Sequence, residues 1–325
     1  MCCYAVIGMG SIAKRHLRNL RFLYPDSDIY VVSSSGKNSD VPEGVVAVLT
    51  LEELIKLTPN YVIIASPSPY HVDNAKLLLE NNIPVLIEKP LASDSDDALK
   101  LLEFCKHGNH PEVAVGYCLR FLPSAIAVKD FIGTDVIGDI YNVNCIVGQY
   151  LPEWRSDKNY KDSVSAQKKL GGGVLLELSH EIDYLNWLFG SMTLQHSWLR
   201  TTEELGLEVE EIADLVFTTE SGIYLSLHLD FIQKTAQRKC EVIGERGRIV
   251  WDLIANTVTF FGAKNTQIIY SDAHYDKNLM YLDMLKVFSD IKNRGMQELA
   301  TIESSLEVIQ LIDIAKMTNK GRNIS

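Results

Sequence analysis

The chain has 325 residues, of which 46% are hydrophobic and 22% are charged, and its formal net charge is −11. A length of this order favours two domains, and the apolar content is sufficient for two large cores. The balance of 31 basic against 42 acidic residues argues against the basic surface that nucleic-acid binding requires.

The six cysteines show no spacing typical of a metal site, and most stand in apolar segments. Such cysteines are typical of reduced thiols in a cytosolic protein. No apolar run approaches the length of a membrane span, and the apolar start leads directly into a glycine turn, unlike a signal peptide. We therefore expect a cytoplasmic protein with no metal site, no membrane contact and no nucleic-acid partner.

Strand and helix patterns alternate over roughly the first 120 residues. Short apolar runs predict strands at 4–7, 29–32, 45–49, 61–65, 85–87 and 113–116. Amphipathic segments between them predict helices at 11–22, 51–57, 71–81 and 94–106. This alternation is typical of the α/β class and predicts a doubly wound parallel sheet of the Rossmann type.

Strands dominate after a predicted helix near 124–132. They are expected at 140–147, 194–201, 212–219, 223–230, 238–243, 248–252 and 257–261. One helix is expected near 173–189, and two more close the chain near 276–293 and 303–317. Short turns between successive strands predict a large, mostly antiparallel open sheet. The expected domains are therefore a Rossmann domain over 1–121 and an α+β substrate and oligomerisation domain over 122–325.

The first predicted strand leads into a glycine-rich turn with the pattern GxGxxA. Its first glycine permits a tight turn, and its second lacks the Cβ that would keep a pyrophosphate away from the backbone. The helix that follows directs free N–H groups and its positive dipole end at the phosphates. A glycine turn alone is common, but this one joins an N-terminal strand to an amphipathic helix. The context predicts dinucleotide binding by Gly8, Gly10, Ser11, Ile12 and Ala13.

The end of the second predicted strand carries hydroxyl groups where NAD enzymes usually place a carboxylate for the ribose 2′-OH. The chain has Ser33, Ser34, Ser35 and Lys37 there, with no acidic residue before Asp40. Hydroxyls and an amine suit a 2′-phosphate, although a serine-rich turn also admits NAD. The sequence therefore favours NADP over NAD.

Several further motifs follow in order along the chain. They are Ala65-Ser66-Pro67-Ser68-Pro69-Tyr70-His71, Glu88-Lys89-Pro90-Leu91-Ala92, Gly116-Tyr117-Cys118-Leu119-Arg120-Phe121, Gly171-Gly172-Gly173 with His180, and Ile243-Gly244-Glu245-Arg246-Gly247. Together with the glycine turn, they make the chain similar to the Gfo/Idh/MocA family of NAD(P)-dependent oxidoreductases over both predicted domains. The stretch 148–190 also resembles a branch associated with bacterial surface-sugar gene clusters.

The resemblance implies hydride transfer between nicotinamide and a hydroxyl-bearing carbon of a sugar or sugar derivative. It implies that Lys89 lies beside the nicotinamide and the reacting carbon, and that the Lys89–Pro90 bond is often cis. A lysine at the carboxyl end of a parallel strand does face the crevice where ligands bind; the alternative is a surface lysine. Four more residues are implied at the cofactor: Ser66, Pro67, His71 and Glu88.

The predicted helix after the three glycines has two distinct faces. Its core stripe is formed by Leu178, Ile182, Leu185 and Phe189. The opposite face carries His180, Tyr184 and Trp187, a combination that is rare on a solvent-exposed helix face. We therefore expect this face to line an interdomain cleft or to pack against another surface. The resemblance implies that His180 is the acid/base. Either Glu177 or Asp183 is expected to orient it, because the family's usual Asp four residues earlier is absent.

Residues 149–170 form a long polar segment with aromatic and basic side chains. Aromatic rings stack on sugars, and an arginine can hold a carboxylate or phosphate bidentately. The expected substrate-binding residues are Arg120, Trp154, Arg155, Tyr160 and Tyr184, which favour an anionic sugar: a sugar acid or a nucleotide sugar. The alternative is an arm that packs on a neighbouring subunit.

Alternating apolar residues in two predicted strands suggest an apolar sheet face, and the family resemblance then implies a homodimer or homotetramer through sheet faces. These residues are Leu215, Phe217, Leu225, Leu227 and Leu229; the alternative is that they face helices of the same chain. Two other functions stay open: an enzyme that uses bound NAD for transient oxidation during elimination or hydrolysis, and a dinucleotide-binding regulator without catalysis.

Overall fold

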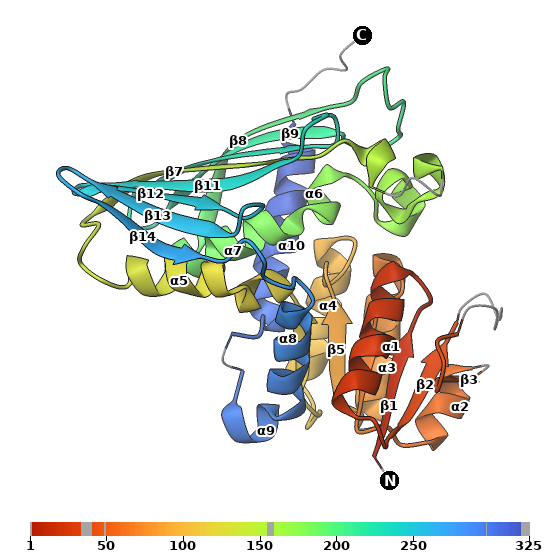
Figure 1. Cartoon of the computed structure of the whole chain (residues 1–325). Coiled ribbons are helices and arrows are strands. Elements are labelled where there is room, and N and C mark those ends of the chain that lie inside the picture. Colours follow the sequence, from red (N-terminus) through yellow and green to blue (C-terminus); the bar gives the residue numbers. More distant parts are fainter. Residues whose placement is uncertain (1, 34–40, 49, 155–158, 297, 320–325) are drawn as a thin grey trace. The chain divides into compact units, whose positions relative to one another are not determined.

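The computed structural model describes residues 2–33, 41–48, 50–154, 159–296 and 298–319 (Figure 1). The chain divides into two compact units, each built from two stretches of sequence. The first is Met1–Cys118 with Asn278–Ile309, and the second is Leu119–Lys277 with Gln310–Ser325. The expected boundary near residue 121 lies close to the first division. The expectation of two contiguous domains differs from the structure, because 278–309 belong to the first unit.

The first unit contains a parallel sheet with the strand order β3-β2-β1-β4-β5-β6. Its strands are β1 (Cys3–Ile7), β2 (Asp28–Val32), β3 (Val46–Val48), β4 (Tyr61–Ile64), β5 (Val85–Glu88) and β6 (Val113–Gly116). Its helices include α1 (Ser11–Leu23), α2 (Leu51–Lys56), α3 (His71–Glu80), α4 (Ser95–Lys106), α8 (Leu279–Ser289), α9 (Ile291–Arg294) and the start of α10 (Ile302–Met317). The predicted doubly wound Rossmann sheet is confirmed.

Local sequence explains most of these elements. The central strands β1, β4 and β5 are buried along their whole length, which is why they consist of apolar runs rather than alternating residues. Two helices begin at side-chain caps: Thr50 accepts a hydrogen bond from the N–H of Glu53, and Asp94 accepts one from the N–H of Asp97.

Contacts between distant residues add the 278–309 stretch to the first unit. The side-chain amides of Asn19 in α1 and Asn278, just before α8, exchange hydrogen bonds of 3.2 and 2.8 Å. The N–H of Val115 in β6 donates to the carbonyl of Ala300 at 2.9 Å. Neither contact follows from a local pattern, so no sequence motif indicates that the chain returns to this unit.

The second unit contains an eight-stranded sheet with the order β14-β13-β12-β11-β7-β10-β9-β8. Its strands are β7 (Ile140–Gly148), β8 (Met192–Arg200), β9 (Ile212–Thr219), β10 (Tyr224–Asp230), β11 (Gln237–Gly244), β12 (Gly247–Asp252), β13 (Thr257–Gly262) and β14 (Thr266–Ser271). Only the β7–β10 pair is parallel among the described pairings. The predicted mostly antiparallel sheet is confirmed, while β14 is an additional strand that the sequence analysis missed.

Helices cover one face of this sheet, which we call its inner face (Figure 1). They are α5 (Pro123–Ile132), which packs on β13 and β14, α6 (Val174–Glu177), which packs on β9 and β10, and α7 (Ser179–Phe189). The alternating apolar residues of β9 and β10 are buried within the chain: Leu215, Phe217, Leu225, Leu227 and Leu229. They occupy the inner face, so the expectation that they form an apolar oligomer surface was wrong.

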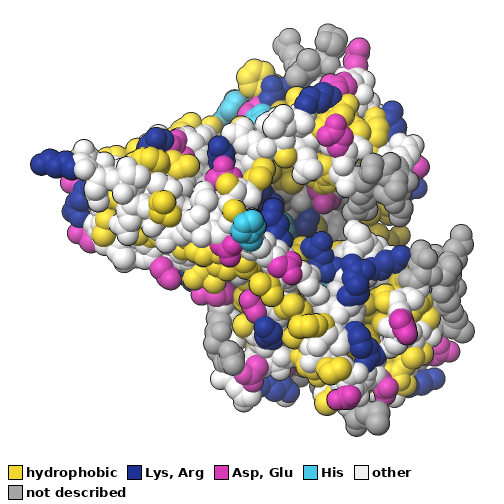
Figure 2. Space-filling view, in the orientation of Figure 1, with side chains coloured by type: hydrophobic (Ala, Val, Ile, Leu, Met, Phe, Trp, Pro, Cys, Tyr) yellow, Lys and Arg dark blue, Asp and Glu magenta, His cyan; other side chains and the backbone are white. Residues whose placement is uncertain are grey.

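Successive residues of a strand point to opposite faces, so the outer face carries the residues that alternate with the buried ones. Among them are Asp214, Ser226, His228, Lys239 and Glu241. Acidic and basic side chains are interspersed with apolar ones over the part of the second unit visible in Figure 2. None of the described helices has the length and apolar character needed to cross a bilayer.

Candidate functional site

The glycine turn at the end of β1 has the geometry of a phosphate-binding turn. Gly8 has φ +118°, and a Cβ at this position would lie 2.5 Å from the carbonyl oxygen of Ala65, so only glycine fits there. A Cβ on Gly10 would meet no atom of the described residues within 4 Å. The turn is therefore closely packed on the side of Gly8 that faces Ala65 and open where a Cβ of Gly10 would point.

The helix that follows presents free backbone donors at this open side. Helix α1 begins after Gly10, no side chain among the described residues caps it, and its first turn holds no acidic residue. Ser11 is exposed and Ile12 half-buried, while Ala13 is fully buried and allows close packing on the sheet. Uncapped N–H groups and the helix dipole stabilise an anion. The residues present thus fit the pyrophosphate of a dinucleotide.

A buried histidine connects the loops that follow β4 and β5. One ring nitrogen of His71 lies 2.7 Å from the carbonyl oxygen of Ser66, and the other lies 2.9 Å from that of Pro90. Burial lowers the pKa of His71, against the opposing effect of the two carbonyls. Both ring edges are engaged by backbone groups, so the ring holds the Ser66-Pro67 loop and the Lys89-Pro90 loop in fixed register.

The residue before Lys89 is anchored inside the unit. The carboxylate of Glu88 lies 2.6 Å from Nε2 of the fully buried His16 and accepts a hydrogen bond of 3.2 Å from the N–H of Lys89. The side chain of Glu88 therefore has protein partners, although it was expected at the cofactor. The Lys89–Pro90 bond is cis, as the resemblance implied. Lys89 itself is half-buried at the carboxyl end of β5.

Only part of the predicted ribose-binding stretch can be placed. Ser33 follows β2 and is half-buried. Ser34, Ser35 and Lys37 lie outside the described residues, as does Arg155 of the predicted substrate segment.

The predicted helix over 173–189 is two helices in the structure. Leu178, with φ −100° and ψ 29°, separates α6 from α7. Glu177 ends α6 and accepts a hydrogen bond of 3.0 Å from the hydroxyl of Ser165. His180 lies in the first turn of α7 and is half-buried. The break turns Glu177 and His180 onto separate helices, which a continuous helical wheel cannot represent.

Asp183 forms a buried ion pair with Arg120. The guanidinium of Arg120 donates to both carboxylate oxygens at 2.9 and 2.7 Å, and the two side chains are 7% and 1% exposed. Burial raises the pKa of Asp183, and the charge of Arg120 opposes that rise. A buried arginine needs such a carboxylate partner. Arg120 and Asp183 therefore hold each other, in contrast to their expected roles at the substrate and beside His180.

Tyr184 faces the sheet rather than an open surface. Its hydroxyl lies 2.8 Å from the sulfur of Cys145 in β7, and its ring packs on Trp251 of β12 at 5.1 Å. The side chain is fully buried, and burial raises its pKa well above the usual range. The expectation that Tyr184 binds substrate was wrong, because α7 is covered on the Tyr184 side by the inner face of the sheet.

A second ion pair on α7, between a buried carboxylate and a half-buried guanidinium, was missed. Glu181 is fully buried and accepts hydrogen bonds of 2.7 and 3.1 Å from the guanidinium of Arg238 in β11. The available signal was an acidic residue next to the apolar stripe of the helix. The opposite charge is 57 residues away, and no local pattern connects the two.

The aromatic residues of the polar segment pack within the chain. Trp154 meets Phe231 edge-on at 5.4 Å and donates its indole N–H to the carbonyl of Gln149 at 3.3 Å. The hydroxyl of Tyr160 donates to the carbonyl of Leu205 at 3.1 Å. Both contacts anchor the segment to its own unit. Among the residues that the structure describes, no cluster of three or more His, Cys, Asp or Glu side chains is arranged to hold a metal ion.

Known proteins are similar to this chain in sequence or in fold. Inositol 2-dehydrogenase of Rubrobacter xylanophilus is 26% identical over 253 residues, 75% of this chain and 69% of that protein. A levoglucosan dehydrogenase solved with NADH superposes with a TM-score of 0.83 at 17% identity, covering 98% of each chain. KijD10, a 3-ketoreductase from Actinomadura kijaniata solved with NADP and TDP-benzene, superposes with a TM-score of 0.80 at 18% identity. The superposition covers 100% of this chain and 99% of KijD10.

Two family models cover most of both units. The oxidoreductase family with an NAD-binding Rossmann fold matches residues 3–117, and the Gfo/Idh/MocA C-terminal domain matches residues 126–250. The first match contains the open glycine turn and Lys89, and the second contains His180 and the Glu181–Arg238 ion pair of α7. The chain belongs to the Gfo/Idh/MocA family of oxidoreductases.

Proposed function

We propose that the protein is an NAD(P)-dependent dehydrogenase or reductase that acts on a CH–OH group of a sugar-like substrate. The observation that carries this proposal is the open, uncapped start of α1 behind Gly8 and Gly10, in the nucleotide-binding unit of an oxidoreductase family. The relatives named inositol 2-dehydrogenase and levoglucosan dehydrogenase support a polyol or sugar as substrate.

Two side chains are proposed as catalytic groups, Lys89 and His180. The bound nicotinamide accepts or supplies the hydride. Lys89, held at the end of β5 by the Glu88 and Pro90 anchors, hydrogen-bonds and polarises the reacting oxygen. His180, at the start of α7, takes up or returns the hydroxyl proton. The ion pairs of Glu181 and Asp183 fix α7, so they position His180 without taking part in the reaction.

The test compares two catalytic variants with two matched controls. Lys89→Met and His180→Asn should each lower turnover by about 100-fold or more, the scale of a lost acid/base group, with folding and cofactor binding retained. Lys76→Met in α3 and His196→Asn on the exposed part of β8 should keep full turnover. Normal turnover of the true substrate by the His180→Asn variant would contradict the assignment of His180 as the acid/base.

The same assay separates the two other functions. An enzyme that oxidises its substrate only transiently converts substrate with no net change in the absorbance of reduced nicotinamide. A regulator binds the cofactor and turns over no member of a broad sugar and polyol panel.

We propose NADP(H) as the preferred cofactor because Ser33 and the serines and Lys37 after it replace the usual acidic residue. KijD10 was solved with NADP and the levoglucosan dehydrogenase with NADH, so members of this fold use both. Parallel titrations should give a lower Kd for NADP than for NAD, and tighter binding of NAD would contradict the proposal.

We further propose an anionic substrate, a sugar acid or a nucleotide sugar, with Arg155 as the anion-binding residue. TDP-benzene in the KijD10 structure supports a nucleotide-linked ligand for this fold. The Trp154 and Tyr160 contacts anchor the segment on both sides of Arg155. Arg155→Ala should raise KM for an anionic substrate at least about tenfold more than for a neutral sugar. An equal effect on both would remove this role.

We propose a cytoplasmic homodimer or homotetramer that associates through the outer face of the second unit's sheet. Trp198 and Tyr224 lie on this face and are 48% and 40% exposed. Cys145 and Cys240 are direct neighbours across β7 and β11 and remain free thiols, which suits a reducing compartment. A monomer in light scattering at micromolar concentration would contradict the assembly.

A further inference from the structure

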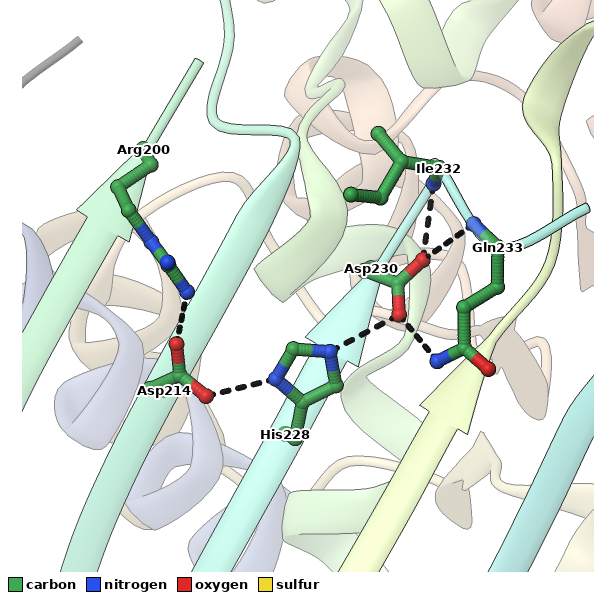
Figure 3. Close-up of polar contacts among 6 residues, drawn as sticks. All are labelled: Arg200, Asp214, His228, Asp230, Ile232 and Gln233. Atoms are coloured by element: carbon green, nitrogen blue, oxygen red, sulfur yellow. Dashed lines mark hydrogen bonds and ion pairs between the residues drawn. The ribbon is translucent and has the colours of Figure 1, made fainter. Parts of the chain in front are cut away.

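A charged network crosses the outer face of the second unit's sheet (Figure 3). Arg200 at the end of β8 pairs with Asp214 in β9. The imidazole of His228 in β10 lies between two carboxylates, with Nδ1 2.6 Å from Asp214 and Nε2 2.9 Å from Asp230. Asp230 is fully buried, whereas the side chain of His228 is 31% exposed. This network has no part in the proposed chemistry, and no sequence motif marks it.

The geometry defines the charge of the histidine. A neutral imidazole carries one N–H, so one of its two nitrogens would point a lone pair at a carboxylate. With both nitrogens facing carboxylates, the doubly protonated imidazolium satisfies both contacts. The imidazolium of His228 then lies between the carboxylates of Asp214 and Asp230, and the guanidinium of Arg200 balances the second negative charge.

Asp230 uses its other hydrogen bonds to shape the turn that follows β10. Its Oδ1 accepts the N–H groups of Ile232 and Gln233, each at 2.8 Å, and its Oδ2 accepts the side-chain amide of Gln233 (Figure 3). A Cβ on Gly148 would lie 2.2 Å from Asp230 Oδ2, so glycine in β7 leaves room for this arrangement. We call residues 230–234 the seat.

The seat holds the start of the polar segment, residues 149–154, which we call the arm. The carbonyls of Asp230 and Phe231 accept the N–H groups of Gln149 and Leu151, at 3.3 and 2.9 Å. The ring of Phe231 also meets the ring of Trp154 at 5.4 Å.

The last residue of the seat adds a further contact. The ammonium of Lys234 lies over the ring of Tyr150, and both side chains bind Glu204. Backbone and side-chain contacts thus fasten the arm to a turn whose shape depends on Asp230.

We propose that the charged form of His228 is a positioning element for the arm: it fixes Asp230 and the seat, and the arm loosens when His228 loses its proton. The proposal concerns the order of the arm and stands without the proposed function. If loosening of the arm also weakens substrate binding, that effect rests on the proposed role of residues 149–170 in holding the substrate.

The surroundings of His228 support a proton that stays bound well above neutral pH. Hydrogen bonds to Asp214 and Asp230 raise the pKa of His228 to about 9, against the opposing effect of burial. Arg200 faces Asp214 from β8, and the neighbour of His228 on β7 is the uncharged Ile146.

Beyond β7, the next charged groups in the same row are Lys239 of β11 and Asp252 of β12, paired with each other at 3.3 Å. From the seat, the neutral amide of Gln233 completes the surroundings of Asp230. The network therefore contains one group that titrates near pH 9.

The test measures hydrogen exchange of the arm in the full chain between pH 7 and 10, expressed as protection factors so that the intrinsic pH dependence of exchange is removed. The amides of Gln149 and Leu151 should lose protection about tenfold with a midpoint near pH 9, the scale of one lost charge-assisted hydrogen bond. Amides in the middle of β7, at 143–146, should stay protected. A flat profile in the arm, or an equal loss in β7, would overturn the proposal.

Two variants complete the test. His228→Gln, neutral at every pH, should show weak arm protection already at pH 7 and no step near pH 9. Ser226→Ala removes another outer-face hydrogen bond, the one to Asn144 at 2.8 Å, and should behave as the unmodified chain does. A His228→Gln variant that keeps full protection and the step would refute the role of His228. Because exchange needs no substrate, this result is independent of the catalytic assignment.

Discussion

The helices α1 and α7 both start without a side-chain cap, yet their surroundings differ: one helix start is open and the other helix is enclosed. The start of α1 is open: Gly10 is exposed, and a Cβ there would meet no described atom within 4 Å. Helix α7 is enclosed, with Glu181 paired to Arg238 and Asp183 paired to Arg120. Open backbone donors are suited to a ligand, whereas paired buried charges fix a scaffold. The comparison supports the proposals that the cofactor binds at α1 and that α7 is a rigid support for His180.

Breaking the enclosure of α7 should have the largest effect on stability. Arg120→Ala leaves Asp183 buried without its partner, so the free energy of unfolding should fall by about 3 to 5 kcal/mol. Urea denaturation measures the change. The control is Arg246→Ala, because the ion pair of Arg246 with Asp135 is solvent-exposed and should contribute less than about 1 kcal/mol. Equal losses in the two variants would show that α7 does not depend on its buried charges.

Filling the tight side of the glycine turn should have the next largest effect. Gly8→Ala adds a Cβ 2.5 Å from a backbone oxygen at a positive φ, which should lower the free energy of unfolding by about 2 to 4 kcal/mol. The oxygen belongs to Ala65 at the end of β4 and cannot move without disturbing the sheet. Retention of full thermal stability in this variant would contradict the close approach.

The outer-face network should make stability depend on alkaline pH. The pKa of His228 is raised in the folded state, so its contribution is complete below about pH 6.5 and declines until the pH passes about 9. After allowance for solvent screening, we expect a loss of about 1 to 2 kcal/mol over this window. Denaturation of the unmodified chain and of His228→Gln at pH 7 and 10 measures it; the variant should lack this component.

The same network should respond to acid in the opposite sense. Burial raises the pKa values of Asp214 and Asp230, but hydrogen bonds to His228 and other groups outweigh this and leave both values below the usual range. Their contribution is therefore present above about pH 4 and is lost as the pH falls further.

Filling the open side of the turn should leave stability almost unchanged. Gly10→Ala meets empty space at φ −69°, so the free energy of unfolding should shift by less than about 0.5 kcal/mol. Its Cβ would stand where the pyrophosphate approaches the backbone, so the Kd for the dinucleotide should rise about tenfold or more. Calorimetric titration measures this, and unchanged cofactor affinity would show that the open side is not the phosphate site.

Local patterns were enough for most of the first unit. The glycine turn, the apolar runs of β1, β4 and β5, and the helices α1 to α4 depend on residues within one element, and all appear as expected. The helix expected at 276–293 is instead divided into α8 and α9. The leucines of β9 and β10 show where such patterns stop: alternation fixed that they share one face, but not which face the helices cover. The prediction of one continuous helix over 173–189 was wrong for a related reason, since a break at Leu178 leaves the hydrophobic periodicity of the sequence intact.

The sequence by itself determined the fold class, the family and the glycine turn, because each depends on residue types at short, fixed spacings. Only the tertiary structure decided the partners of buried polar groups. Arg120 and Asp183 are 63 residues apart, and Glu181 and Arg238 are 57 apart. The Asp214–His228–Asp230 network depends on the register of β9 against β10 and on the turn after it. Charges that must be buried take whichever partner the fold brings within reach, and that choice is made by packing across the chain.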